Sequence, residues 1–191
     1  LAGSEGQDSW EGLLNELYRR RLTGKGVELI TIDGCGGLSA ALRVVYPRIP
    51  VQRCWAHKVR NVLDKVRMSD REAVKRDLRR IYGAKNRMRA VQAAVRFGAR
   101  WDTLYHAAVR CLMKDLEELL NHYVVFADPD WRRASRTTNA IERRFREVRR
   151  RTRPMGVFSD RSSIERILYA VFSYANKGEG AATPFLLTQN T

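Results

Sequence analysis

The fold class expected of this 191-residue chain rests first on the segment V27-E-L-I-T-I-D33 and the loop G34-C-G-G37 that directly follows it. Its apolar and β-branched residues form a short run bounded by glycines, which predicts a buried β-strand over 27–33. Asp33 closes that strand, and the carboxyl ends of strands are where open α/β sheets expose ligand-binding groups. Asp-Gly is also a favoured turn dipeptide, so position alone leaves an ordinary turn as the alternative.

Helical patterns surround this strand. Residues 9–22 predict an amphipathic helix with Ser9 as its N-cap, and 38–45 predict a second one that stops before Pro47. Residues 51–54 are a weaker strand candidate. Strands that alternate with helices favour an α/β fold, here a helix-rich one.

Residues 58–125 change character and predict an all-helical block. Ser69-x-x-Glu72 fits a capping box at the start of a helix whose apolar face carries Val74, Leu78 and Ile81. Two further helices are expected at 87–100 and 103–123, the second with Leu104 in its apolar register. The segment A127-D-P-D-W131 is expected to be the loop that closes the block.

Positive charge gathers in the next segment. The chain has a formal net charge of +15, and Trp131–Pro154 alone holds ten arginines against Glu142 and Glu147, a local surplus of +8. The helix that starts at Thr137-Thr138-Asn139 carries most of these arginines. Arginine suits phosphate oxygens because its guanidinium forms a planar fork, so we expect a nucleic-acid partner. A last helix is expected at 162–175, before a polar tail.

Glu142 lies among these arginines. Asn139-x-x-Glu142 fits a capping box, which would explain the acid without any catalysis. Ile141, Phe145 and Val148 are expected to face a core, and Glu142 borders that face. Two acids from distant parts of the chain, Asp33 and Glu142, could also bind hard divalent cations that clamp a phosphoryl group.

Other chemistries have weaker support. Cys54-Trp-Ala-His57 supplies two zinc ligands where about four are needed, which argues against zinc and favours a partly buried pair beside the strand. G34-C-G-G37 matches no nucleotide-binding loop. Three cysteines form no disulfide framework, which favours a reducing cytoplasm, and no membrane span or signal peptide is expected.

Several motifs, in this order, resemble the transposases of bacterial insertion sequences of the Mutator type. They are I32-D-G-C-G-G-L38, V51-Q-R-C-W-A-H-K-V-R-N61 and T137-T-N-A-I-E-R-R-F-R-E-V-R-R-R-T-R153. The opening S9-W-E-G-L-L-N-E-L-Y-R-R-R-L22 and the later G156-V-F-S159 fit the same pattern. The resemblance therefore covers about 1–175, nearly the whole chain.

The resemblance implies a ribonuclease-H-like core with an inserted all-helical domain and a magnesium site of three acids, Asp-Asp-Glu. Asp33 matches the second aspartate and Glu142 the glutamate, while Cys54 and His57 match the family's C-x-x-H motif. Two magnesium ions would activate water and then a DNA 3′-hydroxyl for strand cleavage and transfer. The domains expected from it are a partial core over 1–57, the helical insertion over 58–130, the core helices with Glu142 over 131–176, and a flexible tail over 177–191.

The partners implied by the resemblance are the double-stranded DNA of transposon ends and target, in the bacterial cytoplasm in association with the nucleoid. Members of the family commonly act as dimers, so a homodimer is a possible assembly, and no membrane contact is expected. The residues expected to bind DNA are arginines of the helix that carries Glu142: Arg143, Arg144, Arg146, Arg149, Arg150, Arg151 and Arg153.

The chain departs from the family pattern at its start. The first aspartate should lie on a strand before the helix at 9–22, and Glu5 and Asp8 are poor substitutes for it. The family's N-terminal DNA-binding region is missing too, and Arg21 stands where a glycine is expected. These features predict the carboxyl-terminal part of a transposase, inactive alone. The alternatives are a non-catalytic nucleic-acid-binding module that uses the arginine helix, and a structural helical protein whose basic face binds acidic proteins.

Overall fold

The computed structural model describes residues 6–156 and 160–178 of the chain. The fold divides into two compact units, Leu1–Thr137 and Thr138–Thr191. Each unit has its own packing and is described by itself. In the described ranges, no helix combines the length and the apolar character that crossing a membrane requires.

The first unit contains a two-stranded parallel sheet. Strand β1 (Ile30–Ile32) pairs with β2 (Val51–Arg53) in a register that sets Ile30 against Val51 and Ile32 against Arg53. Helix α2 (Gly36–Val45) connects the two strands, as a parallel pair requires. The strand predicted over 27–33 is shorter than expected, because the Val27 amide donates to the Gly24 carbonyl oxygen at 3.0 Å in a turn instead of joining the sheet.

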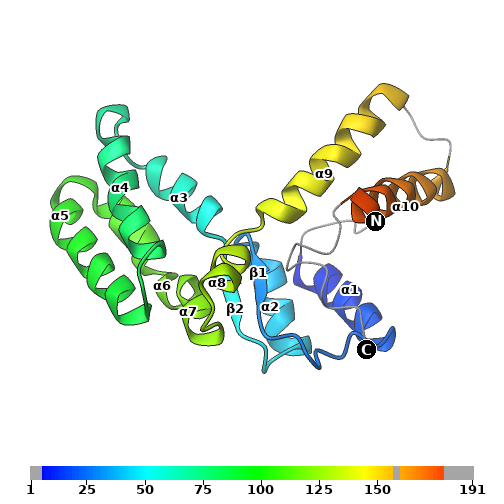
Figure 1. Ribbon diagram of the computed structural model, residues 1–191, viewed down its shortest axis with the longest axis horizontal. Helices are drawn as coiled ribbons and strands as arrows, with labels where there is room; N and C mark the ends of the chain where they lie inside the picture. The colour runs from blue at the N-terminus through cyan, green and yellow to red at the C-terminus, as the bar shows by residue number, and fades with distance from the viewer. Residues whose placement is uncertain (1–5, 157–159, 179–191) are drawn as a thin grey trace. The chain divides into compact units, whose positions relative to one another are not determined.

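Helix α1 (Gln7–Arg19) packs against α2 (Figure 1). It begins after Gly6, so the prediction of Ser9 as the N-cap is wrong and Ser9 lies inside the helix. The helix also ends earlier than expected, with Arg21 at a positive φ of 78°. A left-handed conformation favours glycine, which accounts physically for the glycine that the resemblance places there.

A small core holds α1, α2 and β1 together. Its buried members are Leu14, Ile32, Ala41, Leu42 and Tyr46. The Tyr46 hydroxyl donates to the Leu22 carbonyl oxygen at 2.6 Å, which ties the end of α2 to the segment after α1. This core positions β1, and with it the start of the Asp33 loop.

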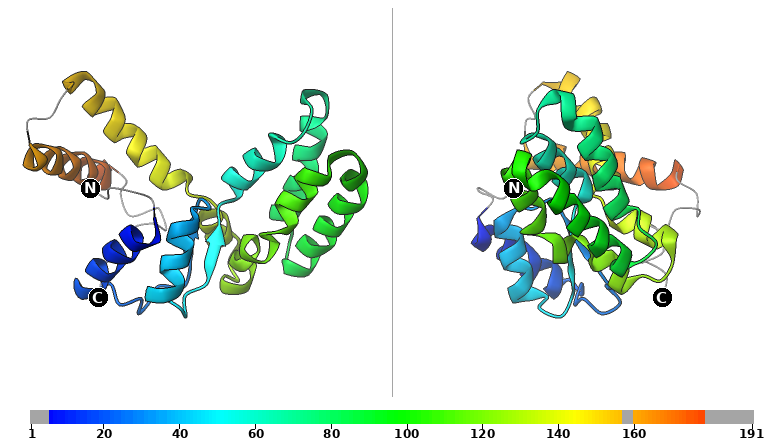
Figure 2. Two further views of the ribbon diagram at one scale, coloured as in Figure 1. Left: turned by 180° about the vertical axis from the view of Figure 1, so that it is seen from behind. Right: turned by 90° about the vertical axis from the view of Figure 1, so that its left-hand side faces the viewer.

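The rest of the first unit is helical, as predicted for 58–125. Figure 2 shows α3, α4 and α5 as an all-helical group beside the two strands. The helices are α3 (Trp55–Leu63), the 3-10 helix η1 (Met68–Asp70), α4 (Arg71–Tyr82), α5 (Arg87–Met113), α6 (Leu116–Leu119), α7 (Asn121–Val125) and α8 (Pro129–Ser135).

Several predicted boundaries in this group are wrong. No capping box forms at Ser69, because 68–70 is a 3-10 turn and α4 starts after Asp70 without a side-chain cap. The break expected between the helices at 87–100 and 103–123 is present as a kink in α5 at Tyr105 (φ −139°, ψ 53°), but the second helix ends at Met113 instead of 123. Leu104, which was expected in the apolar register, directly precedes the kink and is 68% exposed.

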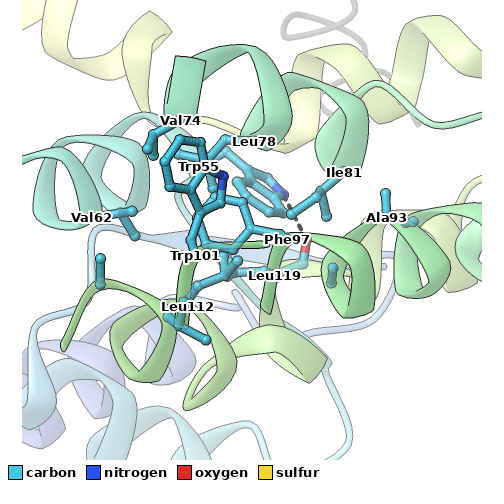
Figure 3. Close-up of a cluster of buried hydrophobic side chains, with 14 of the residues drawn as sticks. Trp55, Val62, Val74, Leu78, Ile81, Ala93, Phe97, Trp101, Leu112 and Leu119 are labelled. Carbon is cyan, nitrogen blue, oxygen red and sulfur yellow. Dashed lines mark hydrogen bonds between the residues drawn. The ribbon is translucent and has the colours of Figure 1, made fainter. Parts of the chain in front are cut away.

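A large apolar cluster fills this helical group (Figure 3). Val74, Leu78 and Ile81 are fully buried, as their spacing predicts. The Trp55 indole nitrogen donates to the Leu119 carbonyl oxygen at 2.8 Å, so the first residue of α3 is fixed to α6. Each large apolar side chain buried here stabilises the fold by roughly 1.5–3 kcal/mol.

Helix α8 replaces the loop that was expected at 127–131. Asp128 caps it by accepting a hydrogen bond from the Asp130 amide at 2.7 Å, and Pro129 occupies its first turn. Aspartate at the N-cap followed by proline at the first helical position is a known start signal, so the sequence contained a local signal for this helix.

The second unit is a pair of helices. It comprises α9 (Asn139–Thr152), the 3-10 helix η2 (Arg153–Met155) and α10 (Arg161–Gly178). Phe145 of α9 meets Phe172 of α10 edge to face at 5.8 Å, and Val148 is buried. Ile141 and Phe145 nevertheless remain about half exposed, at 50% and 46%. The tail predicted at 177–191 lies outside the described residues except for 177 and 178, which close α10.

Candidate active site

Three of the predicted site residues gather at the carboxyl end of the two-stranded sheet. Asp33 directly follows β1, while Cys54 follows β2 and is the residue directly before α3, whose first turn carries His57. The Cys54 amide donates to the Ile32 carbonyl oxygen at 2.7 Å, so the C-x-x-H motif starts beside the peptide that leads into Asp33. This is the sheet edge at which open α/β folds bind ligands.

Asp33 is exposed and holds few contacts of its own. Its Oδ1 accepts a hydrogen bond from the Cys35 amide at 3.1 Å, which shapes the turn. Within the described ranges the carboxylate makes no ion pair and no other hydrogen bond, so its second oxygen is open to a ligand. Gly34, at φ 115°, makes this exposed turn, because few residues with a Cβ adopt that conformation.

Arg53 lies next to the turn, and the sequence analysis did not identify it. A Cβ atom at position 34 would lie 3.1 Å from Arg53 Nη1. The guanidinium is bound elsewhere, since its Nε donates to Glu118 Oε2 at 2.5 Å, and Glu118 also lies 3.6 Å from Arg43. The charge of Arg53 is therefore paired with Glu118 beside the Asp33 turn. Parallel pairing of the two strands sets Arg53 opposite Ile32, and this pairing was the signal that could have placed Arg53 near Asp33. The ion-pair partner of Arg53, Glu118, lies 65 residues away in the sequence, so no local pattern indicates it.

The end of the first unit is anchored at the same place. The Thr31 hydroxyl donates to the Ser135 carbonyl oxygen at 2.5 Å, and the Trp55 amide donates to that of Arg136 at 2.9 Å. These two bonds hold the segment just before Thr138 against β1 and the start of α3. The next turn of the chain begins α9.

Glu142 lies in the first turn of α9, but the predicted capping box is wrong. Thr138, not Asn139, is the N-cap, which places Glu142 one position too far along the helix to close the box. Instead the Thr138 hydroxyl donates to Glu142 Oε1 at 2.7 Å, and the Glu142 amide bonds to the Thr138 carbonyl oxygen at 3.0 Å. The threonine thus orients the carboxylate, which is half-buried.

The arginines of α9 divide by their contacts. Arg150 pairs with Glu147 at 2.7 Å, and the Arg151 guanidinium lies 5.3 Å from the centre of the Tyr174 ring. Four others have exposed guanidinium groups without a hydrogen bond or ion pair inside the described chain: Arg143, Arg146, Arg149 and Arg153. Those four are available for phosphate groups.

The donor atoms fit magnesium only in part. Carboxylate oxygens are the ligands this ion prefers, and both acids offer them. Within either unit, however, the described residues bring no three His, Cys, Asp or Glu side chains together in a group able to hold a metal. Asp33 and Glu142 belong to different units, so their joint coordination of an ion stays a prediction.

A buried histidine of α7, His122, contacts Gln52 of strand β2. His122 is 1% exposed, and its Nδ1 lies 3.1 Å from both Gln52 Oε1 and the Leu119 carbonyl oxygen. Both partners accept, so Nδ1 carries the proton. Burial, with the nearby positive charges of Arg136 and Arg132, lowers the pKa of His122 to about 4. Its imidazole is therefore neutral at pH 7 and serves the packing rather than the site.

Comparison with known proteins gives one family. The model of the family described as "Transposase, Mutator family" matches residues 1–178. Among curated proteins, the chain is 34% identical over 169 residues to the transposase for insertion sequence element IS1201 of Lactobacillus helveticus, which covers 88% of this chain and 44% of that protein.

Two further relatives give the same picture. The transposase for insertion sequence element IS905 of Lactococcus lactis subsp. lactis is 32% identical over 92% of this chain and 44% of its own length. That for element IST2 of Acidithiobacillus ferrooxidans is 37% identical over 91% of this chain and 57% of its own length. The chain spans about half the length of the curated relatives it matches.

Proposed function

The chain belongs to the Mutator family of transposases, and from this we propose that it forms part of a ribonuclease-H-like catalytic domain that cleaves and joins the DNA of an insertion sequence. Asp33 and Glu142 are two of the three acids of its metal site in this proposal. The observation that carries it is Asp33 itself, an exposed carboxylate at the end of a parallel strand, beside the start of the C-x-x-H motif.

The sheet supports the proposed core. Within the described residues β1 has a strand partner on one edge only, β2, whereas a two-stranded sheet alone is marginally stable. A strand that carries the first acid, from a preceding part of a longer protein, would pair with the open edge of β1. Its last residue would then lie next to Asp33, at the carboxyl end of the sheet.

Chain connectivity supports the role of Glu142. Arg136 is fixed to the first residue of α3 through the Trp55 amide, and Glu142 follows it by six residues. The proposal brings the Glu142 carboxylate to the Asp33 turn. In this proposal Thr138 orients the Glu142 carboxylate toward the metal ion, and the second carboxylate oxygen of Asp33 binds the same ion.

Bound magnesium would supply an activated oxygen nucleophile and neutralise charge on the phosphoryl group. The protein's own part is to hold the carboxylates and the DNA. The exposed arginines of α9 would bind backbone phosphates, with Arg143, Arg146, Arg149 and Arg153 in direct contact. Arg150 and Arg151, which have partners inside the unit, would contribute mainly to the field.

A strand-cleavage assay tests the catalytic proposal. We expect the 191-residue chain alone to show negligible magnesium-dependent nicking of DNA that carries the ends of the insertion sequence, because two acids cannot hold both ions. A protein extended before Leu1 so that it supplies the first acid should cleave, and Asp33→Asn or Glu142→Gln in it should abolish cleavage. Robust nicking by the chain alone, lost on Asp33→Ala, would show that a third ligand lies within it and would refute the predicted inactivity.

The exposed arginine surface of α9 also favours a second candidate, a module that binds nucleic acid without catalysis. In that case DNA binding would fall steeply with salt but would ignore magnesium, and Glu142→Gln would cost only a local hydrogen bond, about 1 kcal/mol. Fe²⁺, which replaces magnesium and cleaves the backbone near its ligands, separates the two. Cuts near both Asp33 and Glu142, competed by magnesium, support the catalytic proposal; their absence in the extended protein would favour the binding module.

A further inference from the structure

A pocket opens between α4 and α5, in the helical group and outside the site described above. It has a volume of about 210 Å³ and is lined by Asp77, Arg80, Ala93, Arg96, Phe97 and Arg100. We call it the arginine pocket. Ala93 and Phe97 are buried and form an apolar floor, and the other four side chains bring charge to its rim.

Asp77 organises two of the three arginines. It is 8% exposed and accepts hydrogen bonds from Arg80 Nη1 at 2.6 Å, Arg100 Nη1 at 3.1 Å and the Trp101 indole nitrogen at 3.0 Å. The Arg100 guanidinium also lies 4.7 Å from the centre of the Trp101 ring. Both guanidinium groups are therefore fixed in place while most of their surface stays in solvent.

Arg96 is different from its two neighbours. It lies one helical turn before Arg100 on α5, its side chain is exposed, and it forms no hydrogen bond or ion pair with any described residue. Three arginines and one aspartate give the pocket a net charge of +2. The Asp77 carboxylate already accepts three hydrogen bonds. An arginine that lines a pocket without an acidic partner there leaves its N–H donors free for an anion.

We propose that the arginine pocket binds one phosphate of the DNA backbone, with Arg96 as its main ligand and Arg80 and Arg100 as a fixed positive wall. This inference rests on the proposed function, because it takes DNA as the partner. It adds a second contact surface, on the helical group, to the one on α9.

Size and surroundings favour a backbone phosphate over a small cofactor. The volume is below the range of about 300–1,000 Å³ that is typical of small-molecule sites. The two helices that line the pocket carry further exposed arginines, Arg76 and Arg79 on α4 and Arg89 on α5. A continuous polyanion can contact several separate arginines, whereas a single free anion cannot. The apolar floor suits the deoxyribose next to the phosphate.

Salt-dependent DNA binding tests this contact. Anisotropy of a labelled duplex should be measured with the 191-residue chain over a series of NaCl concentrations. Loss of one phosphate contact lowers the slope of log K against log[salt] by about 0.9, so Arg96→Ala should reduce the slope by that amount, equally on unrelated duplex sequences. Arg96→Lys should restore part of the slope, because the charge returns without the fork.

The matched control is Arg110→Ala, an exposed arginine on α5 beyond the kink that does not line the pocket. Its slope should stay at the wild-type value. Phenylglyoxal modification, mapped by mass spectrometry, gives a local readout: bound DNA should slow the reaction of Arg96 more than that of Arg110.

The outcomes separate this proposal from the proposed function. If Arg96→Ala keeps the wild-type slope while Arg146→Ala on α9 lowers it, the chain binds DNA and only the arginine pocket is excluded. If the wild-type chain binds no DNA at all, both proposals fall. A reduced slope for Arg96→Ala together with protection of Arg96 by DNA supports the pocket.

Discussion

The two buried clusters of the first unit differ in size and in what they position. Sixteen buried side chains form the cluster among α3 to α7, whereas five form the one that holds α1, α2 and β1. The large cluster also contains the buried charged network around Asp77, in which all three donors are in place. The small cluster borders the Asp33 loop, where the carboxylate has a single backbone donor.

This difference separates stability from chemistry. A saturated acid in a packed group of helices stabilises the fold, because its charge is matched and largely removed from water. An exposed acid with one short-range contact contributes little to folding, and its open oxygen is what a metal ligand needs. The large cluster should therefore determine the stability of the chain, and the Asp33 turn should tolerate changes of charge.

The largest expected effect comes from Leu78→Ala. Leu78 is fully buried in the large cluster, so the substitution removes its transfer free energy and leaves a cavity. We expect unfolding in urea to show a loss of about 2–5 kcal/mol. The matched control is Leu104→Ala on α5, which makes the same chemical change at a side chain that is 68% exposed. It should stay within about 0.5 kcal/mol of the wild type. Equal losses for the two variants would refute the assignment of stability to this cluster.

The next effect depends on pH and tests His122, the buried histidine of α7 that contacts β2. The pKa of His122 is lowered from 6.5 to about 4, so between these values the unfolded chain binds a proton that the folded chain does not. Stability should then fall as pH falls through this window, by about 3 kcal/mol in total, and be unaffected by His122 above it. Urea unfolding at a series of pH values measures this.

The control for that titration is His122→Asn, whose amide can still donate near the position of Nδ1 but does not titrate. Only the difference between the two pH curves reports His122, because carboxylates also titrate at the acidic end. Parallel curves between pH 6.5 and 4 would show that His122 protonates without cost.

A smaller loss is expected from Gly34→Ala, in the region of the small cluster. The new Cβ would require a φ of 115° and would lie 3.1 Å from Arg53 Nη1. Such backbone strain costs roughly 1–3 kcal/mol. Arg21→Gly, at a φ of 78°, makes the reverse change and should raise stability by about 1 kcal/mol. Thermal unfolding of the two variants should therefore shift in opposite directions. Destabilisation by both would contradict the strain at Arg21, and stabilisation by both would contradict the strain expected at position 34.

Local patterns predicted much of this fold. The spacing of Val74, Leu78 and Ile81 identified a buried helix face, and the short apolar runs around Ile32 and Gln52 identified the two strands. What local patterns could not show depends on distant partners. The kink at Tyr105 is one such feature, since it brings together residues from the two halves of α5: a Cβ atom at Gly98 would lie 3.3 Å from Met113 Cε.

The candidate site shows the same division. Asp33 could be predicted because a strand end is a local feature, and the C-x-x-H motif could be predicted from its own spacing. Arg53 and Glu118 could not, since their pairing joins β2 to α6 across 65 residues. Asp77 was missed for a related reason: an acid between Arg76 and Leu78 fits the exposed face of a helix, and only Arg100 and Trp101 on α5 explain its burial.

The smallest expected change in stability is that of Asp33→Asn. Compared with the same substitution at Asp77, it tests most directly whether the two acids differ in their contribution to stability. The Asn side-chain oxygen can still accept the hydrogen bond from the Cys35 amide, and no ion pair is lost in the described chain. We therefore expect urea unfolding to change by less than about 0.5 kcal/mol. The identical substitution at Asp77 leaves two arginines and Trp101 without their charged acceptor, and should cost at least about 1.5 kcal/mol. If Asp33→Asn proved as costly as Asp77→Asn, Asp33 would be a structural acid whose contacts extend beyond its turn. If it proved neutral, or even stabilising, while cleavage by the extended protein disappeared, the carboxylate charge at this strand end would serve the reaction alone.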